Sequence, residues 1–141
     1  MNFRFSILLI LILTAAFLIR LAVALNAGEM FDEFAVVTYG EIYWGGIKNL
    51  DFSDNIWRIN YEHPPLAKYV FGLGGTIERN ISWIVETFDS DFHPDKGYFL
   101  ARLFSVLIGV ANIYLIYLIG KQWFGKMAGI ASAAFMAFMP H

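Results

Sequence analysis

The stretch FSILLILILTAAFLIRLAVAL, residues 5–25, carries one charged residue, Arg20, in 21 positions. At a rise of about 1.5 Å per residue, a helix of this length spans about 31 Å, which matches the roughly 30 Å hydrocarbon core of a bilayer. A cleaved signal peptide is the alternative, and Ala22-Val23-Ala24 weakly resembles a cleavage site. Signal peptides have apolar regions of only about 7–15 residues, so the length favours a membrane-spanning helix.

The rest of the chain alternates between polar and apolar blocks. Residues 98–120 form a second apolar segment long enough to span, and residues 127–139 form a third of only 13 residues. With 58% hydrophobic residues and a mean hydropathy of +0.56, the chain is more apolar than ordinary soluble domains. We therefore predict an all-α integral membrane fold, the N-terminal part of a polytopic helix bundle with interfacial helices in a large first external loop. The expected order is a span at 5–25, an external loop at 26–97, a span at 98–120, a cytoplasmic turn at 121–126 and the start of a third span at 127–141.

The charged residues are distributed unevenly. All 12 acidic residues lie between Glu29 and Asp95, together with five basic residues up to position 96, so this segment has a net charge of −7 (five minus 12). Lys121 and Lys126 lie in the short segment after the second span. By the positive-inside rule, that short segment and the N-terminus face the cytoplasm, and the acidic loop faces the other side. A nucleic-acid-binding protein would show a basic stripe, which this chain lacks, and the absence of cysteine excludes a disulfide framework and thiolate ligands.

The acidic loop is rich in aromatic and aliphatic residues, which predicts short helices on the membrane surface rather than disorder. We expect a first helix that starts near Asp32 and ends at Gly45-Gly46, followed by a loop over 49–60. Pro65 can open a second helix, which the glycines at 72, 74 and 75 should weaken or break. Apolar residues at helical spacing follow this proline: Leu66, Tyr69, Val70 and Leu73, then Ile77, Ile81, Ile84 and Phe88.

Two motifs in this loop bring together side chains capable of chemistry. Phe31-Asp32-Glu33 places two adjacent carboxylates a few residues beyond the first span. Glu62-His63-Pro64-Pro65-Leu66-Ala67-Lys68 combines an acid, an imidazole, a rigid Pro-Pro and a lysine within one short segment. We interpret the loop as part of an active site held at the bilayer surface.

Together with Ala101-Arg102-Leu103-Phe104-Ser105 and Gly120-Lys121-Gln122-Trp123-Phe124-Gly125, these motifs resemble the dolichyl-phosphate-mannose–protein mannosyltransferases and the related bacterial aminoarabinose and polyprenyl-phosphate-sugar transferases of the GT-C fold. The resemblance covers essentially the whole chain. It implies an integral membrane enzyme that transfers a sugar from a polyprenyl- or dolichyl-phosphate donor to a protein or lipid hydroxyl, with inversion of the anomeric centre. It also implies that Asp32 is the base on the acceptor hydroxyl, that Glu33 helps to shape the site, and that His63-Pro64-Pro65 lies beside the donor phosphate.

General chemistry agrees with these roles. A hydroxyl that attacks a sugar needs a carboxylate within hydrogen-bond reach. Adjacent residues of a helix point about 100° apart, so we expect one of Asp32 and Glu33 to catalyse and the other to support it. The lipid-phosphate leaving group needs cationic stabilisation, and the candidates for it are His63, Lys68, Arg20 and Arg102.

Each assignment has a plainer alternative. The two acids can be an ordinary helix cap and a solvated side chain, and the cations can orient a turn or snorkel to the lipid headgroups. His93 lies near two aspartates but lacks the spaced partners of a metal site, so no metal ligand is predicted, and whether a divalent metal is used stays open.

The leading hypothesis is a glycosyltransferase whose partners are the lipid-phosphate sugar, a protein or lipid acceptor and the membrane lipids. The alternative is a non-catalytic membrane subunit whose external loop binds a partner. A transporter would place its polar groups at mid-membrane, whereas here they follow the span. Because 13 residues of helix reach only about 20 Å, we expect residues 127–141 to begin a third span, and the chain to be the N-terminal part of a larger protein and inactive alone.

Overall fold

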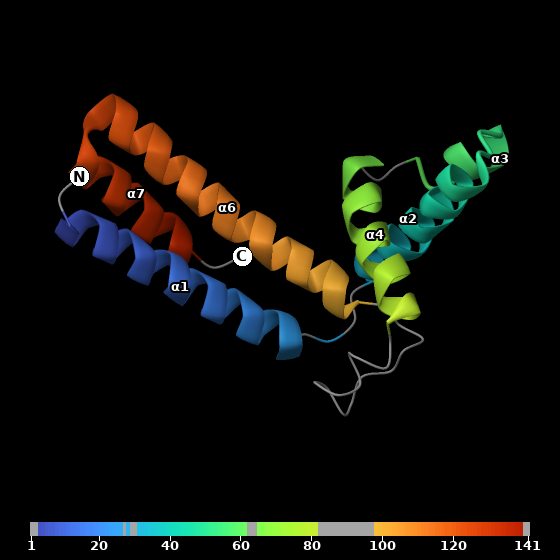
Figure 1. Ribbon diagram of the computed structural model, residues 1–141, viewed down its shortest axis with the longest axis horizontal. Helices are drawn as coiled ribbons and strands as arrows, with labels where there is room; N and C mark the ends of the chain where they lie inside the picture. Colours follow the sequence, from blue (N-terminus) through green and yellow to red (C-terminus); the bar gives the residue numbers. More distant parts are fainter. Residues whose placement is uncertain (1–2, 27, 29–30, 62–64, 82–97, 140–141) are drawn as a thin grey trace. The chain divides into compact units, whose positions relative to one another are not determined.

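The computed structural model describes residues 3–26, 28, 31–61, 65–81 and 98–139. All regular structure in these ranges is helical, which confirms the all-α prediction (Figure 1). The chain divides into two compact units: residues 1–26 with 106–141, here named the membrane unit, and residues 27–105, here named the loop unit. The helices are α1 (Phe3–Asn26), α2 (Phe31–Asn49), α3 (Asp54–Trp57), α4 (Pro65–Asn80), α6 (Phe99–Phe124) and α7 (Lys126–Phe138).

The two long apolar helices that the sequence predicts are α1, in the membrane unit, and α6, which belongs to that unit from residue 106 onward. Residues Phe5–Asn26 of α1 and the whole of α6 are long and apolar enough to cross a membrane. Only 11% and 22% of their most apolar stretches are buried within the protein, so most of this apolar surface faces outward. A helix of a soluble core would be mostly buried, and an apolar exterior of this kind suits a lipid environment.

The helices of the membrane unit pack through small residues. α1 lies along α7, and Ala16, Ala133 and Ala137 are almost completely buried at this contact with Ile12 and Ile113 (Figure 1). Small side chains let helix backbones approach closely, which is the usual way in which helices associate in lipid.

The chain reverses between α6 and α7 within a single residue. The turn predicted at 121–126 is shorter in the structure, because α6 continues to Phe124 and α7 begins at Lys126. Gly125 has a φ of 91°, a conformation that glycine adopts without the steric cost that a Cβ would add. Residues 121–124, between Gly120 and Gly125, include no glycine or proline, so no helix-breaking residue ends α6 before Gly125.

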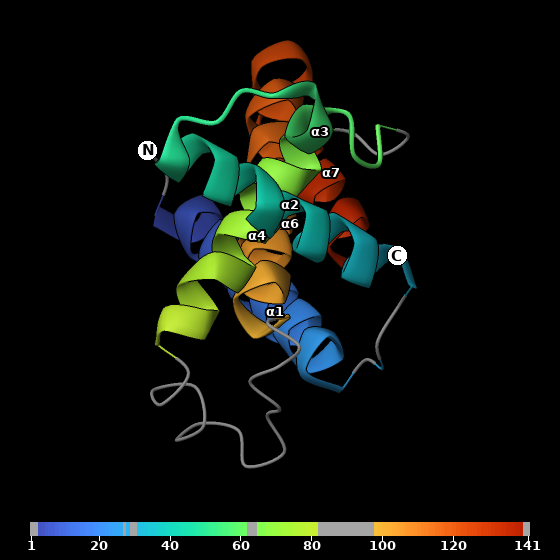
Figure 2. The same ribbon diagram turned by 90° about the vertical axis from the view of Figure 1, so that its right-hand side faces the viewer.

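In the loop unit, α2 crosses α4 with the two backbones in direct contact (Figures 1 and 2). A Cβ on Gly40 of α2 would lie 2.7 Å from Cα of Gly72, and a Cβ on Gly72 would lie 2.7 Å from the backbone nitrogen of Glu41. Only hydrogen atoms fit between the helices at this point, so both residues must be glycine.

The other glycines of α4 also serve close packing, which corrects the expectation that they break the helix. A Cβ on Gly74 would lie 2.7 Å from the backbone nitrogen of Ala101 in the first turn of α6. A Cβ on Gly75 would lie 2.7 Å from Cγ1 of Val37 in α2. The helical propensity that these glycines lose is offset by contacts that a larger residue would prevent.

The end of α2 also differs from the prediction. The helix passes through Gly45-Gly46 and ends at Asn49, because Leu50 takes a φ of 54°. The amides of Leu50 and Asp51 then donate to the carbonyls of Ile47 (3.2 Å) and Gly46 (2.9 Å), the two hydrogen bonds of a Schellman motif. The loop expected over 49–60 contains the short helix α3, and Ile84 and Phe88 of the second apolar face lie outside the described residues.

Replacing Gly40 by alanine should separate α2 from α4 and lower the free energy of unfolding by about 1–3 kcal/mol, because the added Cβ overlaps the backbone of α4. The matched control is Gly45→Ala in the same helix, where a Cβ would meet no atom within 4 Å. That change should stabilise the helix by about 0.5–1 kcal/mol. Thermal unfolding in detergent, followed by tryptophan fluorescence, measures both, and equal midpoints for the two variants would contradict the crossing.

Candidate active site

The predicted acid pair lies in the first turn of α2. Asp32 is exposed, and Glu33 is half-buried. Carboxylates are favourable in this position, because the backbone amides at a helix N-terminus carry partial positive charge. The two neighbouring acids therefore share one helix end but have different surroundings.

Glu33 forms a bidentate ion pair with Arg102 in the first turn of α6. Arg102 Nε lies 2.6 Å from Oε1 of Glu33, and Nη2 lies 2.8 Å from Oε2. The same Nη2 donates to the carbonyl of Gly28 at 3.2 Å, and the guanidinium lies 5.9 Å from the centre of the Tyr98 ring. The side chains of Arg102 and Glu33 are only 21% and 18% exposed, so solvent screens the pair weakly.

This pairing distinguishes the two acids. Both carboxylate oxygens of Glu33 are held by a guanidinium, whereas Asp32 forms no hydrogen bond or ion pair with the described residues. Arg102 is placed against Glu33, and its role as a phosphate ligand stays a prediction. Of the two acids, Asp32 is therefore the one whose carboxylate is exposed and not bound by Arg102.

Lys68 is buried within the loop unit rather than exposed at a lipid surface, so the snorkelling alternative is wrong for this residue. Its side chain is 1% exposed, and Nζ donates to the carbonyls of Asn60 and Ile59 and to the hydroxyl of Tyr43. The Tyr43 hydroxyl itself donates to the Ile59 carbonyl at 2.9 Å. Lys68 thus fixes the backbone that leads into the Glu62–Lys68 motif, whose Glu62, His63 and Pro64 lie outside the described residues.

Arg20 lies in the membrane unit and binds the C-terminal end of α7. It donates to the carbonyls of Met136 (3.2 Å) and Ala137 (3.1 Å), and to that of Ala16 in its own helix (3.4 Å). Because α7 ends at Phe138, the carbonyl of Met136 is one of the last four of the helix and has no intrahelical donor. Arg20 supplies that missing donor, which a helix end in lipid needs. The structure thus places Arg20 against the C-terminal end of α7, and its role as a phosphate ligand stays a prediction.

Two acids of the loop unit, one buried and one partly buried, were not among the predicted site residues. Glu78 of α4 is completely buried and accepts hydrogen bonds from the amides of Phe99 (3.2 Å) and Leu100 (2.7 Å). Burial raises the pKa of Glu78 above its usual value, although the two amides lower it in part, and the nearby Glu41 raises it further. The one sequence signal was the spacing of Gly74 and Glu78, which places both on one face of α4.

Glu41 of α2 is the second acid, and it is partly buried. One carboxylate oxygen pairs with Arg79, and the other is buried with no hydrogen-bond partner in the described part of the chain. Burial raises the pKa of Glu41, although the charge of Arg79 and its hydrogen bond act in the opposite direction.

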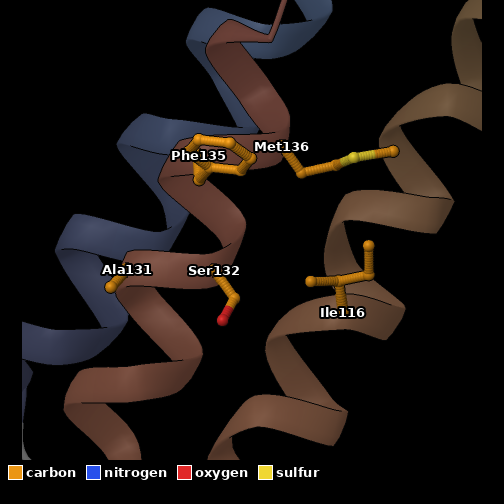
Figure 3. Close-up of a pocket in the computed structure, with 5 residues that line it drawn as sticks. All are labelled: Ile116, Ala131, Ser132, Phe135 and Met136. Carbon is orange, nitrogen blue, oxygen red and sulfur yellow. The ribbon is translucent and has the colours of Figure 1, made fainter.

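A hollow of about 460 Å³ lies between α6 and α7 in the membrane unit, lined by Ile116, Ala131, Ser132, Phe135 and Met136. Figure 3 shows Met136 reaching from α7 toward Ile116 of α6. None of the five side chains titrates near neutral pH, so the hollow offers shape but no acid or base. Among the residues that the structure describes, no three His, Cys, Asp or Glu side chains are grouped as metal ligands.

The Glu33–Arg102 pair should contribute measurably to stability. A double-mutant cycle with Glu33→Ala and Arg102→Ala should give a coupling free energy of about 1–3 kcal/mol, because the pair is bidentate and shielded. The control is Asp54–Arg58, a pair at 3.0 Å whose side chains are 75% and 78% exposed. Its coupling should be about 0.5 kcal/mol or less. Thermal unfolding in detergent gives both values, and equal couplings would contradict a shielded pair.

The raised pKa of Glu41 predicts a specific pH dependence. Because folding favours the neutral carboxyl, its stabilising contribution is complete below the ordinary pKa and is lost as the pH rises through the raised value. The unfolding midpoint of the wild type, measured relative to the non-titrating Glu41→Gln variant, should therefore rise as the pH falls from about 8 to about 5. Asp54→Asn, which removes an exposed carboxylate, is the control. A wild-type midpoint that rises relative to that of Glu41→Gln as the pH increases would contradict a raised pKa of Glu41.

A family model described as dolichyl-phosphate-mannose-protein mannosyltransferase matches residues 62–141, which are 80 of the 141 residues. The match begins at Glu62, includes the Pro-Pro motif, and covers α4, α6 and α7; Asp32 and Glu33 precede it. No curated protein and no solved structure matches the chain. Because the family model covers more than half of the sequence, and the two apolar helices fit a membrane protein, the chain belongs to the dolichyl-phosphate-mannose-protein mannosyltransferase family of membrane glycosyltransferases.

Proposed function

We propose that this chain carries the catalytic base of an inverting glycosyltransferase that uses a polyprenyl- or dolichyl-phosphate sugar as donor and a protein or lipid hydroxyl as acceptor. Family membership supports sugar transfer in general. The observation that carries the finer proposal is the division between the two acids: Glu33 is bound by Arg102, and its neighbour Asp32 is exposed.

In the proposed reaction, Asp32 accepts the proton of the acceptor hydroxyl as the hydroxyl oxygen attacks the anomeric carbon of the sugar. The new C–O bond forms on the face opposite the lipid phosphate. The bond between the anomeric carbon and the phosphate oxygen breaks, and the lipid phosphate leaves with the electron pair. Attack opposite the leaving group inverts the anomeric centre.

The leaving phosphate gains negative charge in this step and needs hydrogen-bond donors or cations close to it. Of the four predicted candidates, Arg102, Lys68 and Arg20 already donate to oxygen atoms of the protein. We assign the contact with phosphate to His63, which belongs to the matched segment but lies outside the described residues. Lys68 then acts indirectly, by holding Ile59 and Asn60 just before the motif.

We further propose that the loop unit faces the extracytoplasmic side, because the acidic residues are concentrated there and Lys121 and Lys126 follow the second span. α1 and α6 are then full spans. The 13 residues of α7 reach about 20 Å, so residues 1–141 alone do not enclose a polyprenyl chain, and we expect no transfer by this segment in isolation.

The proposal is tested in membranes that contain the protein at its natural length. Asp32→Asn keeps the shape of the side chain and removes the base, so kcat should fall by about 10²–10⁴-fold. The KM for the donor should change little, because the acceptor proton moves only in the transition state. The unfolding midpoint should fall only slightly, because Asp32 is exposed and unpaired among the described residues and a carboxylate at a helix N-terminus contributes about 0.3–1 kcal/mol.

Glu33→Gln is the matched comparison. It breaks the ion pair with Arg102, so it should lower the unfolding midpoint while reducing kcat less than Asp32→Asn does. A larger loss of kcat for Glu33→Gln, in protein that is still folded, would reverse the two roles. If neither substitution changes the transfer rate, the loop carries no base, and the alternative of a non-catalytic subunit that binds a partner through this loop is favoured.

A further inference from the structure

The N-terminus of α6 is capped by a side chain from a different helix. The first amides of a helix have no intrahelical acceptor, and the residue before α6, Tyr98, has no side chain suited to capping. Glu78 of α4 accepts from the amides of Phe99 and Leu100 with one oxygen each. Because Glu78 is completely buried, water does not replace these bonds when the carboxylate is removed.

Steric contact adds to the hydrogen bonds. Gly74 lies one turn before Glu78 on the same face of α4, and a Cβ there would lie 2.7 Å from the nitrogen and 2.9 Å from Cα of Ala101. The face formed by Gly74 and Glu78 therefore packs against the first turn of α6 so closely that no side chain fits at position 74. The position of this turn is set by α4.

The same turn of α6 carries Arg102, which binds Glu33 and the Gly28 carbonyl. Residues 99–102 thus contact both α4 and the acid pair. Glu78 of α4 binds their backbone amides, and the guanidinium of Arg102 binds Glu33. α4 in turn begins at Pro65 of the Glu62–Lys68 motif. The first turn of α6 therefore links the Glu62–Lys68 motif, which is assigned to the donor, with the acid pair that contains Asp32, which is assigned to the acceptor.

We propose that Glu78 is a positioning residue for the transfer reaction: by capping α6 it fixes Arg102, and through Arg102 it fixes Glu33 and the adjacent Asp32 relative to α4. This inference rests on the proposed function, since it gives Glu78 a role only if Asp32 acts on the acceptor. Removal of the cap lets Arg102 shift, and small misplacements of a reacting group cost much of the rate.

The decisive variant is Glu78→Gln, which keeps the size of the side chain but presents an NH2 group to one of the two amides. In folded protein, kcat should fall by about tenfold with little change in the KM for the donor. Hydrogen exchange of the amides at 99 and 100 should become faster, and the Glu33–Arg102 coupling should fall by about half or more in the Glu78→Gln background. Glu41→Gln removes a partly buried carboxylate of the loop unit that is bonded to Arg79 rather than to α6, and it should leave exchange at 99 and 100 unchanged.

A cycle with Asp32→Asn separates positioning from general destabilisation. If Glu78 acts through Asp32, the Asp32→Asn/Glu78→Gln double variant should be no slower than Asp32→Asn alone, within about twofold. A full additional loss of rate in the double variant overturns the proposal, as does a wild-type kcat for Glu78→Gln. Should Glu78→Gln fail to fold, Glu78→Asp, which keeps the charge but shortens the reach, serves in the same comparisons.

The two proposals fail in different ways. A wild-type rate for Asp32→Asn alone refutes the base assignment of the proposed function, and with it the effect of Glu78 on the rate. The structural part of the proposal, in which Glu78 caps α6 and thereby fixes Arg102, is then decided by two measurements. Faster exchange at 99 and 100 with a weakened Glu33–Arg102 coupling in the Glu78→Gln variant supports it, and unchanged values for both overturn it.

Discussion

The close crossing of α2 and α4 at Gly40 and Gly72 is the constraint on which the loop unit depends. Because no side chain separates the two backbones, Lys68 of α4 donates to the hydroxyl of Tyr43 in α2. Across the same interface, Arg79 of α4 pairs with Glu41 of α2. A wider crossing would leave these polar groups buried without partners, which costs more than the groups contribute when paired. Glycine at these two positions allows the short distance between the helices. The close packing offsets the low helical propensity of glycine.

The charged residues of the loop unit follow from this geometry. Lys68 and Glu78 are almost completely buried, and both bind backbone atoms of the protein: carbonyls for the lysine, amides for the acid. Each charge therefore satisfies peptide groups at the end of a segment, one before the Glu62–Lys68 motif and one at the start of α6. Arg102 joins this arrangement to Glu33, so the surroundings of the acid pair are set by residues up to 69 positions away in the sequence.

The long apolar helices and the location of the acid pair could be predicted from the sequence, because hydrophobic length and adjacent carboxylates are local properties. The path of the loop helices could not. A glycine breaks an isolated helix but permits close packing, and only the partner helix decides which effect prevails at Gly72 or Gly46. Glu78 escaped prediction because its partners are backbone amides about 20 residues away, and amides leave no sequence signature. The sequence indicated that only one of Asp32 and Glu33 faces the acceptor; Arg102 shows which acid is already engaged.

The contact between Arg20 and α7 also bears on how the protein is assembled during translation. The carbonyls of Met136 and Ala137 that Arg20 binds are synthesised 116 and 117 residues after it. At about 5–20 residues per second, the ribosome takes roughly 6–23 s to supply them, and a guanidinium in lipid is costly in that interval. Arg20 can therefore bind these carbonyls only late in synthesis, once residues 126–138 have formed α7 beside α1.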